Sequence, residues 1–511
     1  METSSSMPAI WNDQFRSDAK QIVRLALPYI FSYVLELLLM PTVSIIFMGW
    51  VGQVEFNVCA IARIFYLLFG SAGHLGLTFA CDTLLSQAYG GNKRQMGIVL
   101  QRAILIAMYI VIFSWIFLIN IQYLTRFIKN DEQYIQLINE YLTFAIVTVP
   151  FEAFSILVQK FTVNHGITSP LLVVNTIGNI VNIIAHYILL HIFNLGVRAP
   201  PIAFSCAYLS MALSCIIYIR WSSIAKETWH SPTRDCLQEW NMYLKLGIPG
   251  IIINFIQSLV YGGSVLLSIL FGADAVTAQG VVFHVDFFLF LISLAFAGSS
   301  NIVIGRYLGA QQYDKAQQAK NVVYRVALIA ILLILIFGFS LWYWIPYLFH
   351  TPESALKQTR KLLAIVIGFC GLDFYHLSQA SMLKACGKQH FDAFVSFLTY
   401  VILGVPSGII FIAVLHLEMI GYWSALLLSL LVTNTVYFIY IRHINWQEQA
   451  ETAQQRVSGN INTDEQTMPL INSHRQQPER LFDLIKYKLL VFLLFLSLFI
   501  CSVLLSRKFH K

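Results

Sequence analysis

The sequence predicts an all-α polytopic membrane protein, made of two six-helix bundles related by an internal repeat and one further C-terminal transmembrane helix. Three observations support this fold class. Of the 511 residues, 57% are hydrophobic and only 12% are charged, about half the charged share of soluble domains. Apolar runs long enough to cross a bilayer as helices recur from one end of the chain to the other. Segments of the first half also have counterparts at a constant distance in the second half.

Twelve apolar runs predict the spans of the two lobes. They lie near 23–48, 58–83, 99–122, 138–161, 171–193, 200–221, 243–271, 277–300, 322–349, 361–384, 392–415 and 418–441. The corresponding units are an N-lobe over 23–221, a polar loop over 222–242 and a C-lobe over 243–442.

The remaining segments are predicted to flank the lobes. Residues 1–22 form a polar N-terminus without a cleavable signal pattern. The Gln-rich stretch 443–486 is poor in core-forming residues and predicts a disordered cytoplasmic linker. A thirteenth span near 487–506 completes the last unit, 487–511.

Lys and Arg predict the orientation, because they are enriched in cytoplasmic loops. Most of them fall in loops on the same side as the N-terminus. The other side holds fewer: Arg126, Lys129, Arg198, Lys357, Arg360 and Lys361. We therefore expect a cytoplasmic N-terminus. The basic residues stand singly in short loops, so the net charge of +7 does not indicate a nucleic-acid partner.

The repeat offset follows from matched positions in similar contexts. Pro28 and Pro249 differ by 249 − 28 = 221, and Gly166 and Gly387 by 387 − 166 = 221. Six helices per half is an even number, so both halves insert in the same orientation, related by an axis along the membrane normal. This is an arrangement that permits alternating access to a site between the halves.

The same offset pairs ionisable residues inside the predicted spans. Glu152 in the fourth span corresponds to Asp373 in the tenth (373 − 152 = 221), and Glu36 in the first to Gln257 in the seventh (257 − 36 = 221). A charge at the bilayer centre costs about 2.5–3.5 kcal/mol on insertion scales, so it faces a cavity or a partner. Each carboxylate is therefore a candidate substrate- or proton-binding group, with an interhelical ion pair or hydrogen bond as the structural alternative.

Further polar side chains accompany these. His376 follows Asp373 by one helical turn, and His284 and Asp286 lie in the eighth span, His284 at the repeat position of Arg63. His284 adds a group that can take up a proton. Arg63 itself is expected near a membrane face.

One polar stripe runs along the predicted fifth span. It comprises Asn175, Asn179, Asn182 and His186, at i, i+4, i+7 and i+11, which places them on one side of the helix. Two interpretations stay open: interhelical hydrogen bonding, worth about 1 kcal/mol each, or the polar lining of an N-lobe cavity.

Three stretches together resemble the multidrug and toxin extrusion (MATE) transporters: "CDTLLSQAYGGNKRQMGIVLQRA", "GRYLGAQQYDKAQQAK" and "VPSGIIFIAVLHLEMIGYWSAL". The similarity spans nearly all of 20–445, in the right order, and the predicted thirteenth helix resembles the animal branch. The resemblance implies a secondary antiporter in which an organic cation leaves the cell as a proton enters. It also implies a central cavity between the bundles that opens to each side in turn.

The chain departs from that pattern at its acids. Animal members usually carry glutamates on the seventh, eighth and tenth helices, at positions that correspond here to Gln257, His284 and Asp373. Only the last is acidic. Bacterial members often use an aspartate late in the first helix, near Val43 or Ser44 here, where none is present. Glu36 and Glu152 add acids to the N-lobe instead, so protonation and cation binding are expected to compete for carboxylates of both lobes.

The predicted function is therefore export of xenobiotic organic cations by a monomeric, multi-pass protein of the plasma membrane. The coupling ion is a proton or a sodium ion, and we expect no other cofactor, no metal site and no catalytic residue. Three alternatives stay open: a flippase for lipid-linked substrates, which would need a cationic cavity, a membrane-embedded enzyme, and a relative that has lost transport. The sequence shows neither paired metal-binding aspartates nor a His-rich cluster of the kind such an enzyme needs.

Overall fold

The computed structural model describes residues 13–125, 131–222, 224–229 and 231–458. Within these residues, twelve helical spans are long and apolar enough to cross a membrane, one for each predicted span. The chain is thus a multi-pass membrane protein. The predicted thirteenth span lies outside the described residues.

The first half contributes six of these spans. They are built from α1 (Asp13–Tyr33) with η1 (Val34–Leu39) and α2 (Met40–Val51), α3 (Gln53–Phe65) with η2 (Tyr66–Ser71) and α4 (Ala72–Gly90), α5 (Gln95–Ile119), α7 (Glu132–Asn164), α8 (Ser169–Tyr187) with η3 (Ile188–Ile192), and η4 (Gly196–Arg198) with α9 (Ala199–Trp221).

The second half contributes the other six. They are α11 (Trp240–Ser268) with η6 (Ile269–Phe271), α12 (Ala273–Gly309), α13 (Tyr313–Leu341), α15 (Glu353–Cys386), α16 (Gln389–Ser396) with η7 (Phe397–Gly404), α17 (Val405–Ile409) and η8 (Ile410–Val414), and α18 (Glu418–Arg442). Short helices lie between spans: α6 (Gln122–Thr125), α10 (Ile224–Thr228), η5 (Arg234–Leu237) and α14 (Ile345–Leu348).

Two predicted boundary segments are helical in the structure. The N-terminal tail predicted over 1–22 is already helix α1 from Asp13 onward. The predicted disordered linker 443–486 is wrong at its start, because Trp446–Ser458 form helix α19. The reason is burial: α19 presents Trp446 and Val457, among others, to the lobes.

The backbone of the two halves confirms the repeat. Pro28 and Pro249 both lie inside the first helix of their half. Gly166 and Gly387 both follow the fourth helix with left-handed backbone, at φ of 73° and 75°. The π-helical segments η3 and η8 both close the fifth span of their half. Local geometry is therefore repeated even where the side chains differ.

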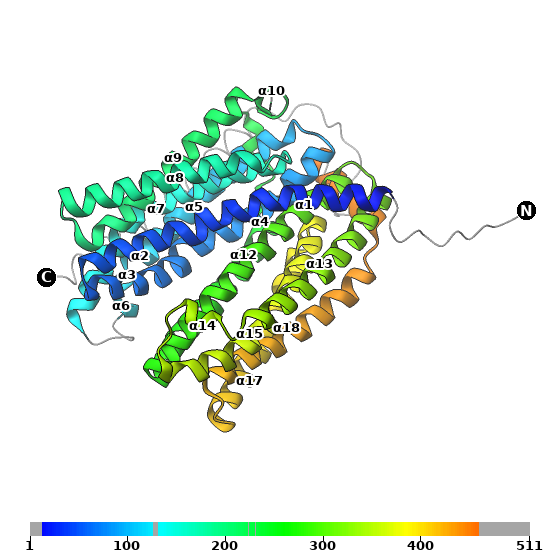
Figure 1. Cartoon of the computed structure of the whole chain (residues 1–511). Coiled ribbons are helices and arrows are strands. Elements are labelled where there is room, and N and C mark those ends of the chain that lie inside the picture. The colour runs from blue at the N-terminus through cyan, green and yellow to red at the C-terminus, as the bar shows by residue number, and fades with distance from the viewer. Residues whose placement is uncertain (1–12, 126–130, 223, 230, 459–511) are drawn as a thin grey trace, which may run out of the picture.

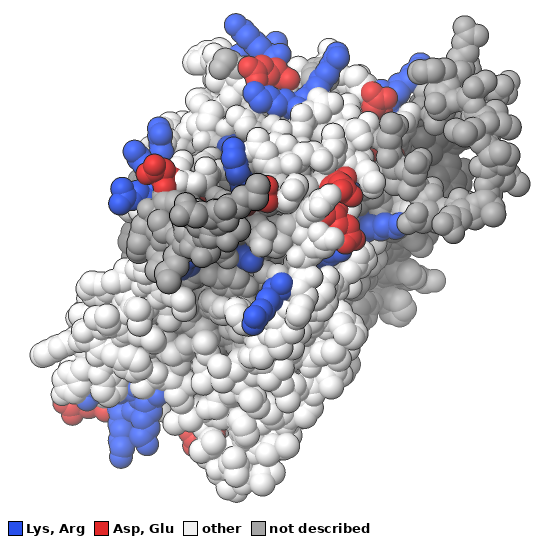
Figure 2. All heavy atoms as spheres, turned by 90° about the vertical axis from the view of Figure 1, so that its right-hand side faces the viewer, with Lys and Arg blue, Asp and Glu red and all other residues white. Residues whose placement is uncertain are grey.

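The lobes lie side by side as two helix bundles, the first half from blue to teal and the second from green to orange (Figure 1). We call the boundary between the two lobes the seam. At one end of the molecule α1 and α11 begin and α4, α12 and α15 terminate; this end is named the "seam end", and the opposite end is named the "far end". On the face shown in Figure 2, charged side chains lie over the upper half and at the lower left, with a largely uncharged surface between them. Large apolar side chains such as Leu332 and Phe337 of α13 are exposed on the surface, as lipid contact requires.

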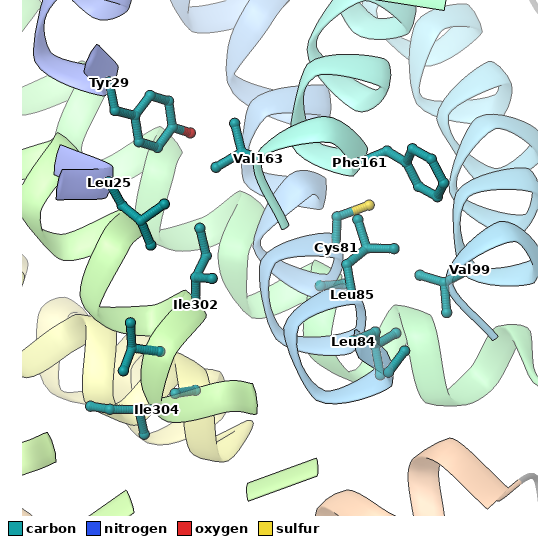
Figure 3. Packing of buried hydrophobic residues seen from close by; sticks show 14 of the residues in the cluster. Leu25, Tyr29, Cys81, Leu84, Leu85, Val99, Phe161, Val163, Ile302 and Ile304 are labelled. Atoms are coloured by element: carbon teal, nitrogen blue, oxygen red, sulfur yellow. The ribbon is translucent and has the colours of Figure 1, made fainter. Parts of the chain in front are cut away.

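Within the described residues, the hydrophobic core that the two lobes share lies toward the seam end. One buried cluster there combines Leu25 of α1 and Leu84 of α4 with Ile302 and Ile304 of α12 (Figure 3). Toward the far end, the clusters separate: one contains only residues of the first half and the other only residues of the second. The structure is therefore closed at the seam end, and toward the far end each lobe has a hydrophobic core of its own. The lobes still touch there through α11, where Asn254 donates to the Ala72 carbonyl at 3.1 Å and the rings of Phe255 and Phe69 lie 6.4 Å apart.

Candidate functional site

Glu152 lies at the centre of a buried polar cluster in the N-lobe. Its side chain is 3% exposed. The hydroxyls of Tyr66 and Ser71 donate hydrogen bonds to Oε2 at 2.5 and 2.8 Å, and Tyr208 donates to Oε1 at 3.2 Å. His74 Nε2 lies 3.5 Å from Oε2. These partners come from η2, α4 and α9, so the carboxylate ties three elements to α7.

Arg63 adds a positive charge to this cluster. Its guanidinium lies over the rings of Tyr66 and Phe204, at 5.5 and 5.2 Å from their centroids, and it interacts electrostatically with Glu152. Cation–π contacts of this kind stabilise a guanidinium away from water. The expectation that Arg63 lies near a membrane face missed this role as counter-charge.

Replacing Glu152 with glutamine is expected to lower the free energy of unfolding by about 2 kcal/mol. The amide keeps the shape but puts an N–H group where hydroxyls now donate, which leaves buried donors unmatched. Thermal unfolding in detergent measures the change. The matched control is Glu140→Gln, because the exposed Glu140–Arg198 pair (3.2 Å) contributes only about 0–1 kcal/mol. Equal midpoints for both variants would contradict the structural role of Glu152.

Glu36 occupies a second polar cluster, on the π-helical segment η1. Gln159 Nε2 and Asn175 Nδ2 each donate to its carboxylate at 3.3 Å. The side chain is 6% exposed. Glu36 and Glu152 also interact electrostatically. Both N-lobe acids are therefore buried among hydrogen-bond donors.

The polar stripe of α8 binds the first span. Asn175 donates to the carbonyl of Ser32, and further contacts follow along the stripe. They join Asn179 to the Leu35 carbonyl (3.0 Å), Asn182 to the Met40 carbonyl (3.2 Å) and His186 Nε2 to Ser44 Oγ (2.6 Å). The Leu35 carbonyl belongs to η1, and those of Ser32 and Met40 flank it, so these amides bond the first span along its π-helical segment and on both sides of it. Of the two interpretations left open by the sequence, the contacts support interhelical hydrogen bonding.

The C-lobe holds its acids differently. Asp373 of α15 is 4% exposed and lines a cavity of about 10 Å³ together with Gln257, Tyr261 and Tyr400, which is about the room that one water molecule needs. No side chain in the described part of the chain donates a hydrogen bond to Asp373, and its electrostatic partner is Asp286 of α12.

Asp286 is equally short of partners. The side chain is 1% exposed. Oδ1 accepts only the thiol of Cys370, at 3.4 Å, and Oδ2 has no hydrogen-bond partner in the described residues. Two buried carboxylates thus interact with one another and with few donors, in contrast to Glu152. Such a pair is stable only when a proton or another cation reduces its charge.

The two predicted histidines lie elsewhere. His284 is exposed on α12, bonds the Gly280 carbonyl at 2.7 Å and contacts the ring of Phe349. His376 is buried, with its ring stacked on Tyr437 at 5.4 Å. The structure therefore brings Asp373 and Gln257 together in one cavity and places Asp286 where it interacts electrostatically with Asp373, and neither histidine lines that cavity.

A charged cluster joins the lobes at the seam end. Asp82 of α4 lies 3.0 Å from Lys160 Nζ of α7 and 3.8 Å from Lys384 Nζ of α15. Lys384 belongs to the other lobe, so the pair bridges the seam. Within the described residues, no group of three or more His, Cys, Asp or Glu could hold a metal ion.

Two lobes with a core in common at one end and buried acids inside each lobe define a two-lobe membrane transporter. The MatE family matches residues 28–188 and 249–410, and the second match begins 249 − 28 = 221 residues after the first. The chain belongs to the MatE family.

Individual proteins agree with this assignment. The chain is 25% identical over 449 residues to multidrug and toxin extrusion protein 1 of Homo sapiens, covering 88% of this chain and 79% of that protein. It is 28% identical to multidrug and toxin extrusion protein 2 of Mus musculus, over 86% of this chain and 77% of the relative. The fold is similar to the crystal structure of the eukaryotic MATE transporter AtDTX14, with a TM-score of 0.80, 19% identity, and coverage of 87% of this chain and all of the other.

Proposed function

We propose that this protein is a secondary antiporter that exports organic cations from the cell in exchange for protons. Its Asp286–Asp373 pair is the shared site of both cations. The observation that carries the proposal is the contrast between the lobes. Glu152 is bonded by three hydroxyls, whereas Asp373 has no donor in the described residues and faces Asp286. An acid pair without donors favours binding of one positive charge at a time.

The side chains around the pair would suit an organic cation once the cavity, which now has room for one water molecule, widens during transport. Tyr261, Tyr400 and Phe369 line the cavity with Asp373, and aromatic faces attract quaternary ammonium groups. A proton and an organic cation then compete for the same carboxylates, which couples the two fluxes without a separate device. In this mechanism, Glu152 and Glu36 hold the N-lobe together and are not the principal proton carriers.

The proposed orientation places the seam end in the cytoplasm of a cell with this protein in its plasma membrane. The support is the concentration of Lys and Arg in loops at that end. The structure is then closed toward the cytoplasm, and transport requires the seam to open and close in turn. We propose a monomer as the transporting unit, with no catalytic step.

The test uses the full chain in proteoliposomes loaded at acidic pH, with tetraethylammonium outside. Asp373→Asn and Asp286→Asn are each expected to lower the uptake driven by the pH gradient about tenfold or more, the factor that ~1.4 kcal/mol of lost interaction produces. The matched control is Asp274→Asn, an exposed carboxylate at the start of the same α12. Its uptake should equal that of the wild type.

Two results would count against the proposal. Wild-type uptake by both Asp373→Asn and Asp286→Asn would exclude the pair as the site. Uptake driven by a sodium gradient and indifferent to the pH gradient would replace the proton with sodium as the coupling ion.

A further inference from the structure

The fourth helix of each lobe ends beneath an arginine from elsewhere in the chain. Gly166 follows α7 and Gly387 follows α15, both with left-handed backbone. A Cβ on Gly166 would lie 2.6 Å from a guanidinium nitrogen of Arg306, and a Cβ on Gly387 would clash with the guanidinium of Arg456. The repeat therefore places an arginine over both helix ends. Arg306 comes from α12, however, and Arg456 from α19.

Two hydrogen bonds cross the seam in opposite directions at these helix ends. Arg306 of the C-lobe donates to the Asn164 carbonyl of the N-lobe at 2.8 Å, and Gln87 of the N-lobe donates to the Ala385 carbonyl of the C-lobe at 2.8 Å. The acceptors are repeat mates, since 385 − 164 = 221. Carbonyls at a helix end lack partners within the helix, so each lobe caps the fourth helix of the other as long as the seam is closed.

Helix α19 is anchored on the C-lobe at its beginning. Trp446, Ala450 and Ala453 are buried, and the helix contacts α12 and α13. Gln311, just after α12, donates to the Ala450 carbonyl at 3.1 Å. The ammonium of Lys320 lies 5.8 Å from the centroid of the Trp446 ring. The first turns of α19 therefore belong to the C-lobe.

The last turn of α19 reaches the other lobe. Val457 is buried against the end of α4, where its Cγ1 would lie 3.2 Å from a Cβ on Gly91. Arg456 donates to the carbonyl of Cys386 at 3.3 Å, at the same helix end that Gln87 caps. One helix thus contacts both sides of the seam beside the crossed hydrogen bonds.

We propose that α19 is a strap across the seam, in which Arg456 and Val457 are positioning residues that hold the two lobes together at the seam end. α19 must release α4 before the seam end opens. The strength of the contact between α19 and α4 therefore sets how readily the seam end opens and closes. The inference rests on the proposed opening and closing of the seam, but its test does not need a transported substrate.

Three native cysteines serve as reporters in the full chain. Cys386 lies under α19 and is 0% exposed. Cys81 of α4 is also 0% exposed and contacts the Tyr243 hydroxyl of the other lobe at 3.1 Å. Cys59, in the separate N-lobe core toward the far end, reports global unfolding. N-ethylmaleimide labels the protein in proteoliposomes, and mass spectrometry follows each cysteine.

Arg456→Ala is expected to raise the labelling rates of both Cys386 and Cys81 about fivefold, which corresponds to about 1 kcal/mol, without changing that of Cys59. Val457→Ala trims only the contact with α4, which makes it the milder second variant, and should raise the rate at Cys81 by a smaller factor. Gln455→Ala, an exposed neighbour in the same turn, should label like the wild type. Arg456→Lys, which keeps the charge but not the planar fork, should fall between Arg456→Ala and the wild type.

Two outcomes would overturn the proposal that α19 is a strap across the seam. Faster labelling of Cys386 alone would mean that α19 covers the C-lobe without holding the seam. Wild-type labelling of Cys81 in both Arg456→Ala and Val457→Ala would mean that α19 exerts no hold. If the wild type transported no organic cation while Cys81 responded as expected, the antiport proposal would fail and the strap would stand.

Discussion

Asp82→Asn is expected to lower the free energy of unfolding by about 3 kcal/mol or more. Removing one partner from a buried ion pair leaves an uncompensated charge, and here it leaves two, because Lys160 and Lys384 both face Asp82. The three side chains are only 11–16% exposed. Since Lys384 belongs to the opposite lobe, the repulsion between the lysines also acts across the seam. Thermal and guanidinium unfolding in detergent measure the loss.

The control for this prediction is Glu227→Gln at an exposed pair near the same end of the molecule. Lys93 Nζ lies 2.7 Å from Glu227 Oε2, and the hydrogen bond from Lys93 lowers the pKa of Glu227. Solvent screens this pair, so no measurable change in stability is expected. Unfolding of Asp82→Asn at the wild-type midpoint would show that the buried cluster contributes no net stability.

Gly309→Ala is expected to shift the protein away from the state that is closed at the seam end. A Cβ on Gly309 would overlap the Gln87 carbonyl, and a Cβ on Gly90 would overlap the Arg306 carbonyl, so the backbones of the two lobes are in direct contact here. Forcing a methyl group into a packed contact costs about 1–3 kcal/mol, which corresponds to a shift of about 5- to 150-fold. Faster maleimide labelling of Cys81 measures the shift, and slower transport should accompany it.

Gly368→Ala provides the matched control. A Cβ on Gly368, within α15, meets no atom within 4 Å, and alanine is the better helix former by about 1 kcal/mol. This variant should label like the wild type and unfold at the same or a higher temperature. If Gly309→Ala behaved in the same way, the backbone contact between the lobes would have to be adaptable, contrary to the packing described here.

The helical framework was predictable because lipid imposes it. All twelve spans predicted for the two lobes are helical in the described residues, since an apolar run in a bilayer has no alternative to helix. The ends were less predictable. α1 is already helical at Asp13, well before the predicted span, and Phe15 and Asp18 are buried at the seam end, where Tyr307 of the other lobe donates to Asp18 at 2.7 Å. Hydropathy detects contact with lipid, whereas these residues contact protein.

Helix α19 carried a weaker signal. Its buried apolar residues Trp446, Ala450, Ala453 and Val457 follow helical spacing, but two of these four are alanines, which hardly raise the hydropathy of a Gln-rich segment. A test of periodicity would have found the helix where a test of composition indicated disorder.

The candidate site was only partly predictable. The repeat identified Glu152 and Asp373 as mates, yet their environments differ because the partners come from distant segments. Tyr66 and Ser71 lie about eighty positions before Glu152, at separations of 86 and 81 residues, and no local pattern links them to it. The placement of Asp286 inside the C-lobe and of His284 outside it follows from helix rotation, which a two-residue spacing alone leaves ambiguous.

Because the lobes share a core at the seam end, a tilt of one lobe relative to the other would pivot near that end. α12 has 37 residues and is therefore about 55 Å long. A tilt of roughly 10° about the seam displaces the opposite tip of such a helix by about 10 Å, while atoms near the pivot move by about 1–2 Å. The displacement caused by one added methyl group at the seam end would thus be several times larger at the far end. In the proposed alternation, the smallest side chains at the seam end would therefore set how far the lobes separate at the opposite end of the protein.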